Sequence, residues 1–253
     1  MDSTTCAALL ALNHQFYQTF ALQFSATRQR LQPGVQRLLP ELLRADRLLD
    51  LGCGNGELAR RLVKQGTRGQ YVGLDFSPGL LQAAEGEASP GEASPGDASP
   101  AQVLFIPGDL AQPGWEETLP QTPYDLVLAF AVLHHLPGEA LRRQVLQAVR
   151  RLLAPGGRFI FSNWQFLNSP RLAQRIQPWE AAGLSPAQVD PGDYLLDWRA
   201  GGRGLRYVHH FSQEELTALA QECGFSILES FVSDGENGQS SLYQVWQPSF
   251  IYF

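Results

Sequence analysis

The sequence predicts an α/β fold in which a doubly wound, mostly parallel sheet ends in an antiparallel edge hairpin. Short apolar runs of strand type alternate with helical patterns through residues 47–163, as in chains of successive strand–helix–strand units. A glycine-rich turn at 52–56 joins the first of these strands to a helix. Near the C-terminus, alternating patterns at 225–232 and 242–246 flank a polar turn, which predicts the hairpin.

The order of these patterns divides the chain into four parts. Residues 1–46 are expected to form an N-terminal helical arm, and 47–163 the α/β core. Within the core, 86–100 repeats a Glu/Asp-Ala-Ser-Pro-Gly unit; a proline every five residues cannot continue a helix, so a disordered surface insertion is expected. Residues 164–210, rich in aromatic side chains and arginine, are expected to form a substrate lid. Residues 211–253 then add a helix and the edge hairpin to the same domain.

Composition restricts the function and the compartment. The 253 residues carry a net charge of −6, which argues against a broad, unspecific grip on nucleic acid. No run of eighteen apolar residues occurs, so no membrane association is expected, and the N-terminus lacks a secretory pattern. The three cysteines are widely spaced, as reduced thiols are in cytoplasmic proteins. A cytoplasmic protein is the expectation.

The turn after the first strand predicts a cofactor with an amino acid end. Asp50 ends the strand, and Gly52, Gly54 and Gly56 stand at alternate positions beyond it. A dinucleotide fingerprint would need its third glycine at position 57, where this chain has Glu57. A carboxylate at position 50 would repel a diphosphate, but it could hold an ammonium group.

The second strand ends in another carboxylate. Residues 71–77 read Tyr-Val-Gly-Leu-Asp-Phe-Ser, which places Asp75 nineteen residues past Gly56. A ribose hydroxyl pair needs an acceptor at this point of a doubly wound sheet. The two acids and the glycines therefore predict a nucleoside cofactor with an amino acid end.

These motifs resemble those of class I S-adenosylmethionine-dependent methyltransferases. The resemblance continues in Gly-Asp-Leu at 108–110, in 124–135, and in Leu-Leu-Ala-Pro-Gly-Gly-Arg at 152–158. It implies a seven-stranded, Rossmann-like sheet and S-adenosyl-L-methionine as cofactor. It also implies that Asp109 takes the adenine amino group, that the Leu110 amide meets a ring nitrogen and that Phe76 covers the adenine face. The full set of cofactor-binding residues expected is Asp50, Gly52, Gly54, Asn55, Asp75, Phe76, Asp109, Leu110 and Phe130.

A narrower resemblance is to the wobble-uridine tRNA carboxymethyl methyltransferases. It rests on the aromatic Ser-x-Thr-Arg arm at 17–28, on Ala-Val-Leu-His-His at 131–135, and on Arg-Tyr-x-His-x-Phe at 206–211. It implies tRNA as substrate, a methyl ester as product and, as in eukaryotic members, a small zinc-binding activator subunit as partner. The lid sequence at 192–199 departs from the form usual in that family.

The methyl acceptor decides which side chains catalyse. A hydroxyl or amine must lose a proton, for which His134, His135, His209 and His210 are candidates. A carboxylate is already a nucleophile and needs a cationic clamp instead. The residues expected to catalyse are Arg28, Arg206 and His209; those expected to bind substrate are Tyr17, Tyr194, Trp198, Arg199, Arg203 and Tyr207. The histidine pairs lack further ligands at metal-binding spacing, so no metal is expected.

Two helices near the lid carry further expectations. The helix at 139–153 is amphipathic, and Arg142, Arg143, Arg150 and Arg151 are expected on its solvated face. Ser212 is expected to cap the next helix, with Glu215 completing a capping box.

Two alternatives to tRNA methylation remain open at the level of sequence. The chain could methylate a small-molecule carboxylate, hydroxyl or amine, for which its acidic charge and compact lid are adequate. It could also be a catalytically silent subunit that binds cofactor and stabilises a partner. The presence together of Asp50, Gly52, Gly54, Asp75 and Asp109 counts against that last alternative, because a subunit freed from catalysis has no chemical need for all five.

Overall fold

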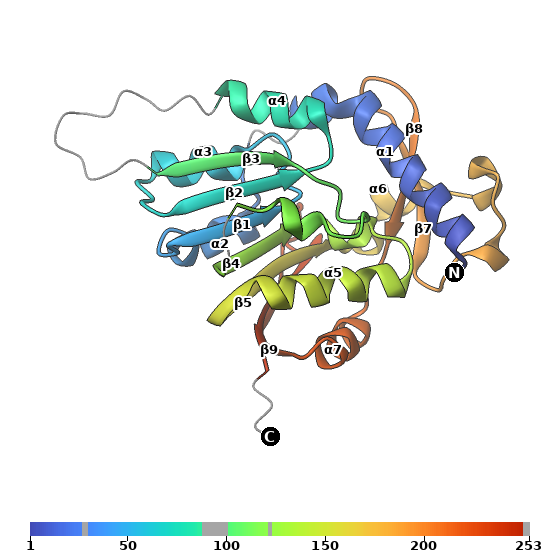
Figure 1. The fold of residues 1–253 in the computed structure, drawn as a ribbon. Helices are drawn as coiled ribbons and strands as arrows, with labels where there is room; N and C mark the ends of the chain where they lie inside the picture. The colour runs from blue at the N-terminus through green and yellow to red at the C-terminus, as the bar shows by residue number, and fades with distance from the viewer. Residues whose placement is uncertain (27–29, 88–100, 121–122, 250–253) are drawn as a thin grey trace.

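The computed structural model describes residues 1–26, 30–87, 101–120 and 123–249 (Figure 1). Arg28 and most of the repeat at 86–100 therefore lie outside the described residues. The central sheet has seven strands in the order β3-β2-β1-β4-β5-β10-β9. Their bounds are β1 (Arg47–Leu51), β2 (Gln70–Asp75), β3 (Gln102–Pro107), β4 (Tyr124–Phe130), β5 (Leu153–Trp164), β9 (Phe225–Ser233) and β10 (Ser241–Pro248).

The strand directions confirm the predicted fold class. Strands β1 to β5 pair in parallel, whereas β10 pairs antiparallel with both β5 and β9. The parallel strands are joined by α3 (Glu57–Lys64), α4 (Pro78–Glu87) and α5 (Glu139–Leu152). The strand order reverses on either side of β1, which leaves a crevice at the carboxyl ends of β1 and β4, the place where open α/β sheets bind ligands.

Helices cover both faces of the sheet. On one face, α5 and α7 (Gln213–Glu222) pack on inward side chains such as Val127 and Phe159, which are fully buried. On the other face, α2 (Pro33–Leu42) and α3 pack on Leu128 and Ile160. This two-sided burial explains why the central strands are apolar throughout instead of alternating.

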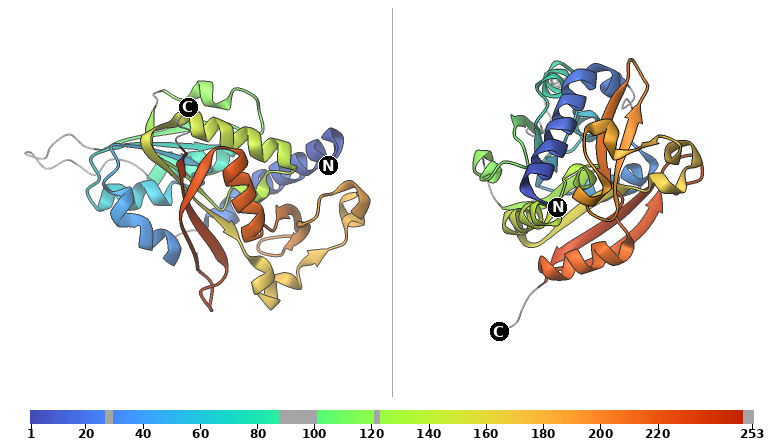
Figure 2. Two further views of the ribbon diagram at one scale, coloured as in Figure 1. Left: turned by 90° about the horizontal axis from the view of Figure 1, so that it is seen from below. Right: turned by 90° about the vertical axis from the view of Figure 1, so that its right-hand side faces the viewer.

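The predicted lid contains a second sheet that the sequence did not predict. Strands β6 (Ile176–Gln177), β7 (Asp193–Trp198) and β8 (Gly204–His209) form a three-stranded antiparallel sheet, which follows the short helix α6 (Pro170–Ala173). The N-terminal helix α1 (Ser3–Ala26) packs along β8, as the right-hand view of Figure 2 shows. Helix α1 therefore connects the small sheet to the crevice of the large one.

Arg142 corrects one expectation from the sequence. Its side chain is not solvated but is only 2% exposed, at the buried end of α5. The helical spacing explains this position, since Arg142 precedes Val145, Leu146 and Val149 by three, four and seven residues and so shares their inward face. Its three neighbours in the prediction, Arg143, Arg150 and Arg151, do reach solvent at least in part.

Ser212 caps α7 as expected, since its hydroxyl accepts the Glu215 backbone N–H at 3.1 Å. The Glu215 side chain, however, contacts His209 and Arg142. Within the described ranges, no helix is long and apolar enough to cross a membrane.

Candidate cofactor-binding site

The glycine turn between β1 and α3 forms the floor of the crevice. Gly52 and Gly54 both have left-handed backbone conformations, with φ of +68° and +58°. A Cβ on Gly52 would lie 2.5 Å from Cγ2 of Val132, whereas a Cβ on Gly54 would meet nothing within 4 Å. Gly52 therefore allows close packing, while Gly54 leaves bare backbone facing open space, which suits a ligand that lies against the main chain.

Asp75 holds this turn from the next strand. Its Oδ2 accepts the Gly54 backbone N–H, and its Oδ1 accepts the Ser77 N–H, each at 2.9 Å. Burial raises the pKa of Asp75, although the backbone hydrogen bonds act in the opposite direction. The carboxylate thus fixes the turn and stands at the edge of the crevice.

Asp50 is the second buried acid of the crevice. The Tyr71 hydroxyl donates a hydrogen bond to its Oδ2, and only 4% of the residue is exposed. Burial raises the pKa of Asp50 to about 7; the Tyr71 hydrogen bond opposes this shift, and the charge of Asp75 adds to it. A buried acid of this kind favours a cationic neighbour, because a positive charge would stabilise its ionised form.

Asp109 lies beyond the end of β3, on the far side of the crevice. Its Oδ1 accepts the Ala111 backbone N–H at 2.9 Å, and its Oδ2 lies 3.3 Å from Nε2 of His14 in α1. Partial burial raises the pKa of Asp109, but the hydrogen bonds from His14 and Ala111 outweigh this effect and leave it below its usual value.

A cavity of about 220 Å³ joins these groups at the carboxyl ends of the parallel strands. All nine residues that the sequence predicts to bind cofactor line it: Asp50, Gly52, Gly54, Asn55, Asp75, Phe76, Asp109, Leu110 and Phe130. Three acids at separate points of a cavity with bare glycine backbone between them fit a ligand with an amino group, sugar hydroxyls and a base. These hydrogen-bond acceptors fit S-adenosylmethionine, which carries an amino group, sugar hydroxyls and a base.

Helix α1 supplies one wall of this cavity, and most of that wall is missing from the prediction. Of the residues on α1 that line the cavity, the sequence predicts Tyr17 but not Leu10, Asn13 or His14. The signal that could have found them is the spacing of Asn13 and Tyr17, which places two polar side chains on one face of a helix.

Asn13 fixes α1 over the crevice. Its Nδ2 donates to the backbone oxygens of His135 and Tyr207, each at 3.2 Å. Its Oδ1 accepts the Tyr207 N–H at 2.8 Å. A single buried side chain thereby joins α1 both to β8 and to the segment that follows β4.

Tyr17 and His135 form a hydrogen-bonded pair in the cavity wall. His135 Nδ1 lies 3.2 Å from the Tyr207 carbonyl oxygen, which can only accept, so the proton is assigned to Nδ1. Nε2 is then the acceptor for the Tyr17 hydroxyl, at 2.8 Å. The sequence offers His134, His135, His209 and His210 as candidate bases; among the four, His135 is the one that lines the cavity.

Arg206 lies in an aromatic box behind α1. Its guanidinium carbon is 4.4 Å from the ring centroid of Trp164, 5.4 Å from that of Phe16 and 5.5 Å from that of Trp198. The residue is only 3% exposed and does not line the cavity. Arg206 is connected to the cavity only through α1: it contacts Phe16, and the next residue of the helix, Tyr17, lines the cavity.

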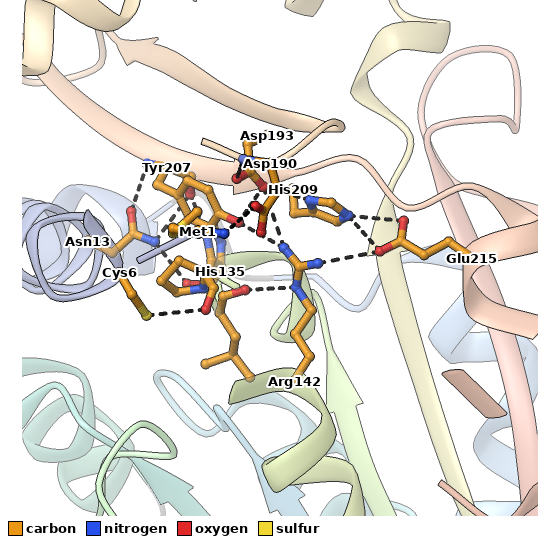
Figure 3. A network of polar contacts seen from close by, with 12 residues as sticks. Met1, Cys6, Asn13, His135, Arg142, Asp190, Asp193, Tyr207, His209 and Glu215 are labelled. Atoms are coloured by element: carbon orange, nitrogen blue, oxygen red, sulfur yellow. Dashed lines mark hydrogen bonds and ion pairs between the residues drawn. The ribbon is translucent and has the colours of Figure 1, made fainter. Parts of the chain in front are cut away.

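Tyr207 and His209 belong to a buried polar network around Arg142 (Figure 3). Arg142 donates to the Tyr207 hydroxyl at 2.9 Å and forms ion pairs with Asp193 and Glu215. The two ring nitrogens of His209 lie 2.7 Å from Asp193 and 2.9 Å from Glu215. The network ties β7 and β8 to α5 and α7, and neither Tyr207 nor His209 lines the cavity.

The remaining predicted substrate residues lie in the small sheet and its loops. Trp198 packs against Phe16, and Tyr194 packs against Phe166. Arg199 is 64% exposed and paired with Asp197, and Arg203 is exposed in the β7–β8 turn. The structure brings none of these four to the cavity wall. No group of three or more potential metal ligands is present in the part of the chain that the structure describes.

Sequence similarity to named methyltransferases extends over most of the chain. A family model described as a methyltransferase domain matches residues 24–230. A methyltransferase of Encephalitozoon cuniculi is 30% identical, with 85% of this chain and 88% of that protein covered. The tRNA (carboxymethyluridine(34)-5-O)-methyltransferase of Schizosaccharomyces pombe is 29% identical, with 85% and 89% covered.

Solved structures share the fold. A SAM-dependent methyltransferase of Methanosarcina mazei superposes with a TM-score of 0.62 at 20% identity, covering 87% of this chain and 99% of that one. A methyltransferase of Haloferax volcanii, solved in complex with the Trm112 methyltransferase activator, gives 0.61 at 17% identity, covering 94% and 97%. Because the family model matches residues 24–230, and the fold and the cavity agree with it, the chain belongs to the methyltransferase domain family and is a class I S-adenosylmethionine-dependent methyltransferase.

Proposed function

We propose that this chain methylates the carboxyl group of a carboxymethylated wobble uridine in tRNA, which gives a methyl ester. The observation that carries the proposal is the match to the tRNA (carboxymethyluridine(34)-5-O)-methyltransferase of Schizosaccharomyces pombe, which extends over 85% of this chain and 89% of that enzyme. A match of this extent covers more of the chain than the cofactor-binding core alone.

Asp50, Asp75 and Asp109 are each proposed to bind a different part of the cofactor. Asp50, whose ionised form a cation would stabilise, is proposed to hold the amino group of the methionine part. Asp75 is proposed to accept hydrogen bonds from the ribose hydroxyls, and Asp109 from the adenine amino group. Phe76 would cover the base, and Gly54 allows the cofactor to approach the main chain.

The chemistry needs positioning more than proton transfer. When bound, S-adenosylmethionine would supply a methyl group on a sulfonium; a carboxylate oxygen of the acceptor would form the new O–C bond, and the electrons of the broken C–S bond would return to sulfur. Because no proton is lost from the acceptor, no base is required. Holding the reactants in line can contribute about 7 to 11 kcal/mol.

A cationic clamp is the catalytic role that this acceptor requires. Arg28, which lies outside the described residues, is proposed to fill it, and Arg206, which is buried and does not line the cavity, is proposed to act through α1 as a positioning residue. The aromatic rings around Arg206 hold its guanidinium in one place next to α1. The arrangement of His209 favours a positioning role over that of a base, since both ring nitrogens already face carboxylates.

A second candidate is a small molecule with a hydroxyl or amine. The pair of Tyr17 and His135 in the cavity wall favours it, because Nε2 of His135 could take a proton through the Tyr17 hydroxyl. A small activator subunit is also a candidate partner, since the Haloferax volcanii neighbour was solved with one.

Incubation of the purified chain with radiolabelled cofactor and separated tRNA, protein and small-molecule fractions tests these proposals. Label in the tRNA fraction that mild alkali removes supports the ester, and label in the small-molecule fraction supports the second candidate. Parallel reactions with and without an added activator subunit test the partner. Cofactor binding without transfer to any fraction would contradict both substrates and favour a silent subunit.

A further inference from the structure

We propose that His14 is an additional residue of the cofactor site: its imidazole takes the place of the adenine base in the free protein, and cofactor binding displaces it. The inference rests on the proposed assignment of Phe76 and Asp109 to the adenine end of the cavity. It adds that a side chain of helix α1 competes with the cofactor for this end of the cavity.

The position of the His14 ring is the first support. Nε2 of His14 lies 3.3 Å from Oδ2 of Asp109, and the ring centroid lies 4.6 Å from that of Phe76 with 32° between the planes. An imidazole is a flat aromatic ring with an N–H donor at its edge. His14 therefore makes the two contacts assigned to adenine: a ring on Phe76 and a donor to Asp109.

The surroundings of Phe76 and Asp109 leave little room for a second ring and a second donor beside His14. The other oxygen of Asp109 already accepts the Ala111 backbone N–H at 2.9 Å. Phe76 meets a second ring of α1, because Tyr17 contacts it edge-on at 5.8 Å. A base that stacks on Phe76 and donates to Oδ2 of Asp109 must therefore move the imidazole.

His14 can move without releasing α1. Its side chain is 31% exposed, so a rotation toward solvent is open to it. The helix is held separately by the three hydrogen bonds of Asn13 and by the bond from Tyr17 to His135. Removal of the imidazole is thus expected to leave the cavity wall in place, which makes a His14 variant informative.

The charge of His14 gives the competition a pH dependence. The hydrogen bond and charge of Asp109 raise the pKa of His14 above its ordinary value of 6.5, against the opposing effect of burial. If the cofactor takes Asp109, this support is lost and the pKa of His14 falls. Binding then releases a proton, so affinity for the cofactor should rise as the pH rises from about 6.5.

Other titratable groups face the same cavity, and a sound test must separate them from His14. They are Tyr17 on α1, Arg30, Asp50, Cys53, Glu57, Asp75 and His135. Asp50 titrates near the same pH, at about 7. The ratio of the affinities of a His14 variant and the wild type cancels the contribution of Asp50, because both proteins contain it.

Calorimetric titration with S-adenosylhomocysteine provides the test. The proteins are wild type, His14→Ala, and the matched control Gln15→Ala, which makes the same helix substitution at the neighbouring exposed position. At about pH 6.5, His14→Ala should bind about threefold more tightly than wild type, a size typical of a partly exposed ion pair. The advantage should shrink at about pH 8.5, and Gln15→Ala should match wild type.

Nuclear magnetic resonance gives a readout that does not depend on affinity. The imidazole signal that disappears in His14→Ala should titrate above 6.5 in the free protein and lower with saturating S-adenosylhomocysteine. Equal or weaker binding by His14→Ala, or an unchanged pKa on ligand addition, overturns the proposal. Absence of binding by wild type would overturn the cofactor assignment as well, so the two failures are distinguishable.

Discussion

The backbone N–H of Gly54 donates to Oδ2 of Asp75 across 2.9 Å, so the carboxylate at the end of β2 fixes the glycine turn that follows β1. The same turn is held again by the N–H groups of Gly52 and Cys53, which donate to the Leu74 carbonyl oxygen. The floor of the cavity is therefore pre-formed by the pairing of adjacent strands. Ligand binding does not have to pay for ordering it.

Alanine substitutions at two glycines of this turn should separate stability from binding. Gly52→Ala places its Cβ 2.5 Å from Val132 at a positive φ, and should cost about 2 to 5 kcal/mol of stability. Gly54→Ala meets no neighbour and should cost about 1 to 2 kcal/mol, while its methyl group fills ligand space. Urea unfolding and titration with S-adenosylhomocysteine check this; a Gly54→Ala protein that binds like wild type contradicts it.

Asp50→Asn should have opposite effects on stability and on binding. The folded-state pKa of Asp50, about 7, lies above its ordinary value of 3.8, so its contribution to stability is present below about pH 4 and is lost as the pH rises to about 7. Asparagine cannot ionise, so the variant avoids this loss of stability, which is on the order of 4 kcal/mol. At about pH 8 the variant should therefore be more stable than wild type.

The same Asp50→Asn variant should bind S-adenosylhomocysteine at least about tenfold more weakly at about pH 8, because the amino group loses its charged partner. Unfolding measured across the pH range and calorimetry provide both readouts. Stability and affinity that fall together at about pH 8 would be evidence against the proposed role of Asp50.

Arg142→Met and Arg143→Met form a matched pair on α5. Arg142 is buried between Asp193 and Glu215, so its removal takes the guanidinium away from two carboxylates, of which Asp193 is buried, and should cost about 3 to 5 kcal/mol. Arg143, with 42% of its side chain exposed, should cost less than about 1 kcal/mol. The free energies of unfolding from urea titration check the difference. Equal losses would show that the network does not anchor the small sheet.

Arg206→Lys should spare cofactor binding and impair methyl transfer. Lysine keeps the charge but lacks the planar guanidinium that stacks on Trp164 and contacts Phe16 of α1. We expect S-adenosylhomocysteine affinity within about twofold of wild type and a turnover at least about tenfold lower. Arg203→Lys, at an exposed position of the β7–β8 turn, is the control. Loss of cofactor binding with unchanged melting temperature would contradict a role of Arg206 in methyl transfer alone.

The fold and the floor of the cavity were predictable because they depend on local sequence. Asp50, Gly54 and Asp75 stand at strand ends, where parallel pairing brings them to one edge whatever the rest of the chain does. Asp109 follows β3 in the same way. Short motifs were therefore enough to find nine of the residues that line the cavity.

The wall and the lid were not predictable in the same way, because they depend on contacts between distant segments. Asn13 lies in an apolar stripe whose partner, β8, is 194 residues away at Tyr207. Arg142 is buried because Asp193 and Glu215 reach it from other elements, and no local pattern records that. The strands of the small sheet are short, and four successive residues of β8, from Arg206 to His209, are buried, so β8 lacks the alternation that marks a strand.

Titration of the purified protein with S-adenosylhomocysteine, alongside Asp75→Ala and Asp46→Ala, tests the assignment of the cavity most directly. Asp46 is an exposed aspartate just before the opposite end of β1, so its replacement controls for loss of charge. We predict one saturable site in wild type and in Asp46→Ala, and binding at least about tenfold weaker in folded Asp75→Ala, where the ribose acceptor is gone. No binding by wild type, or equal binding by all three, would contradict the cofactor site.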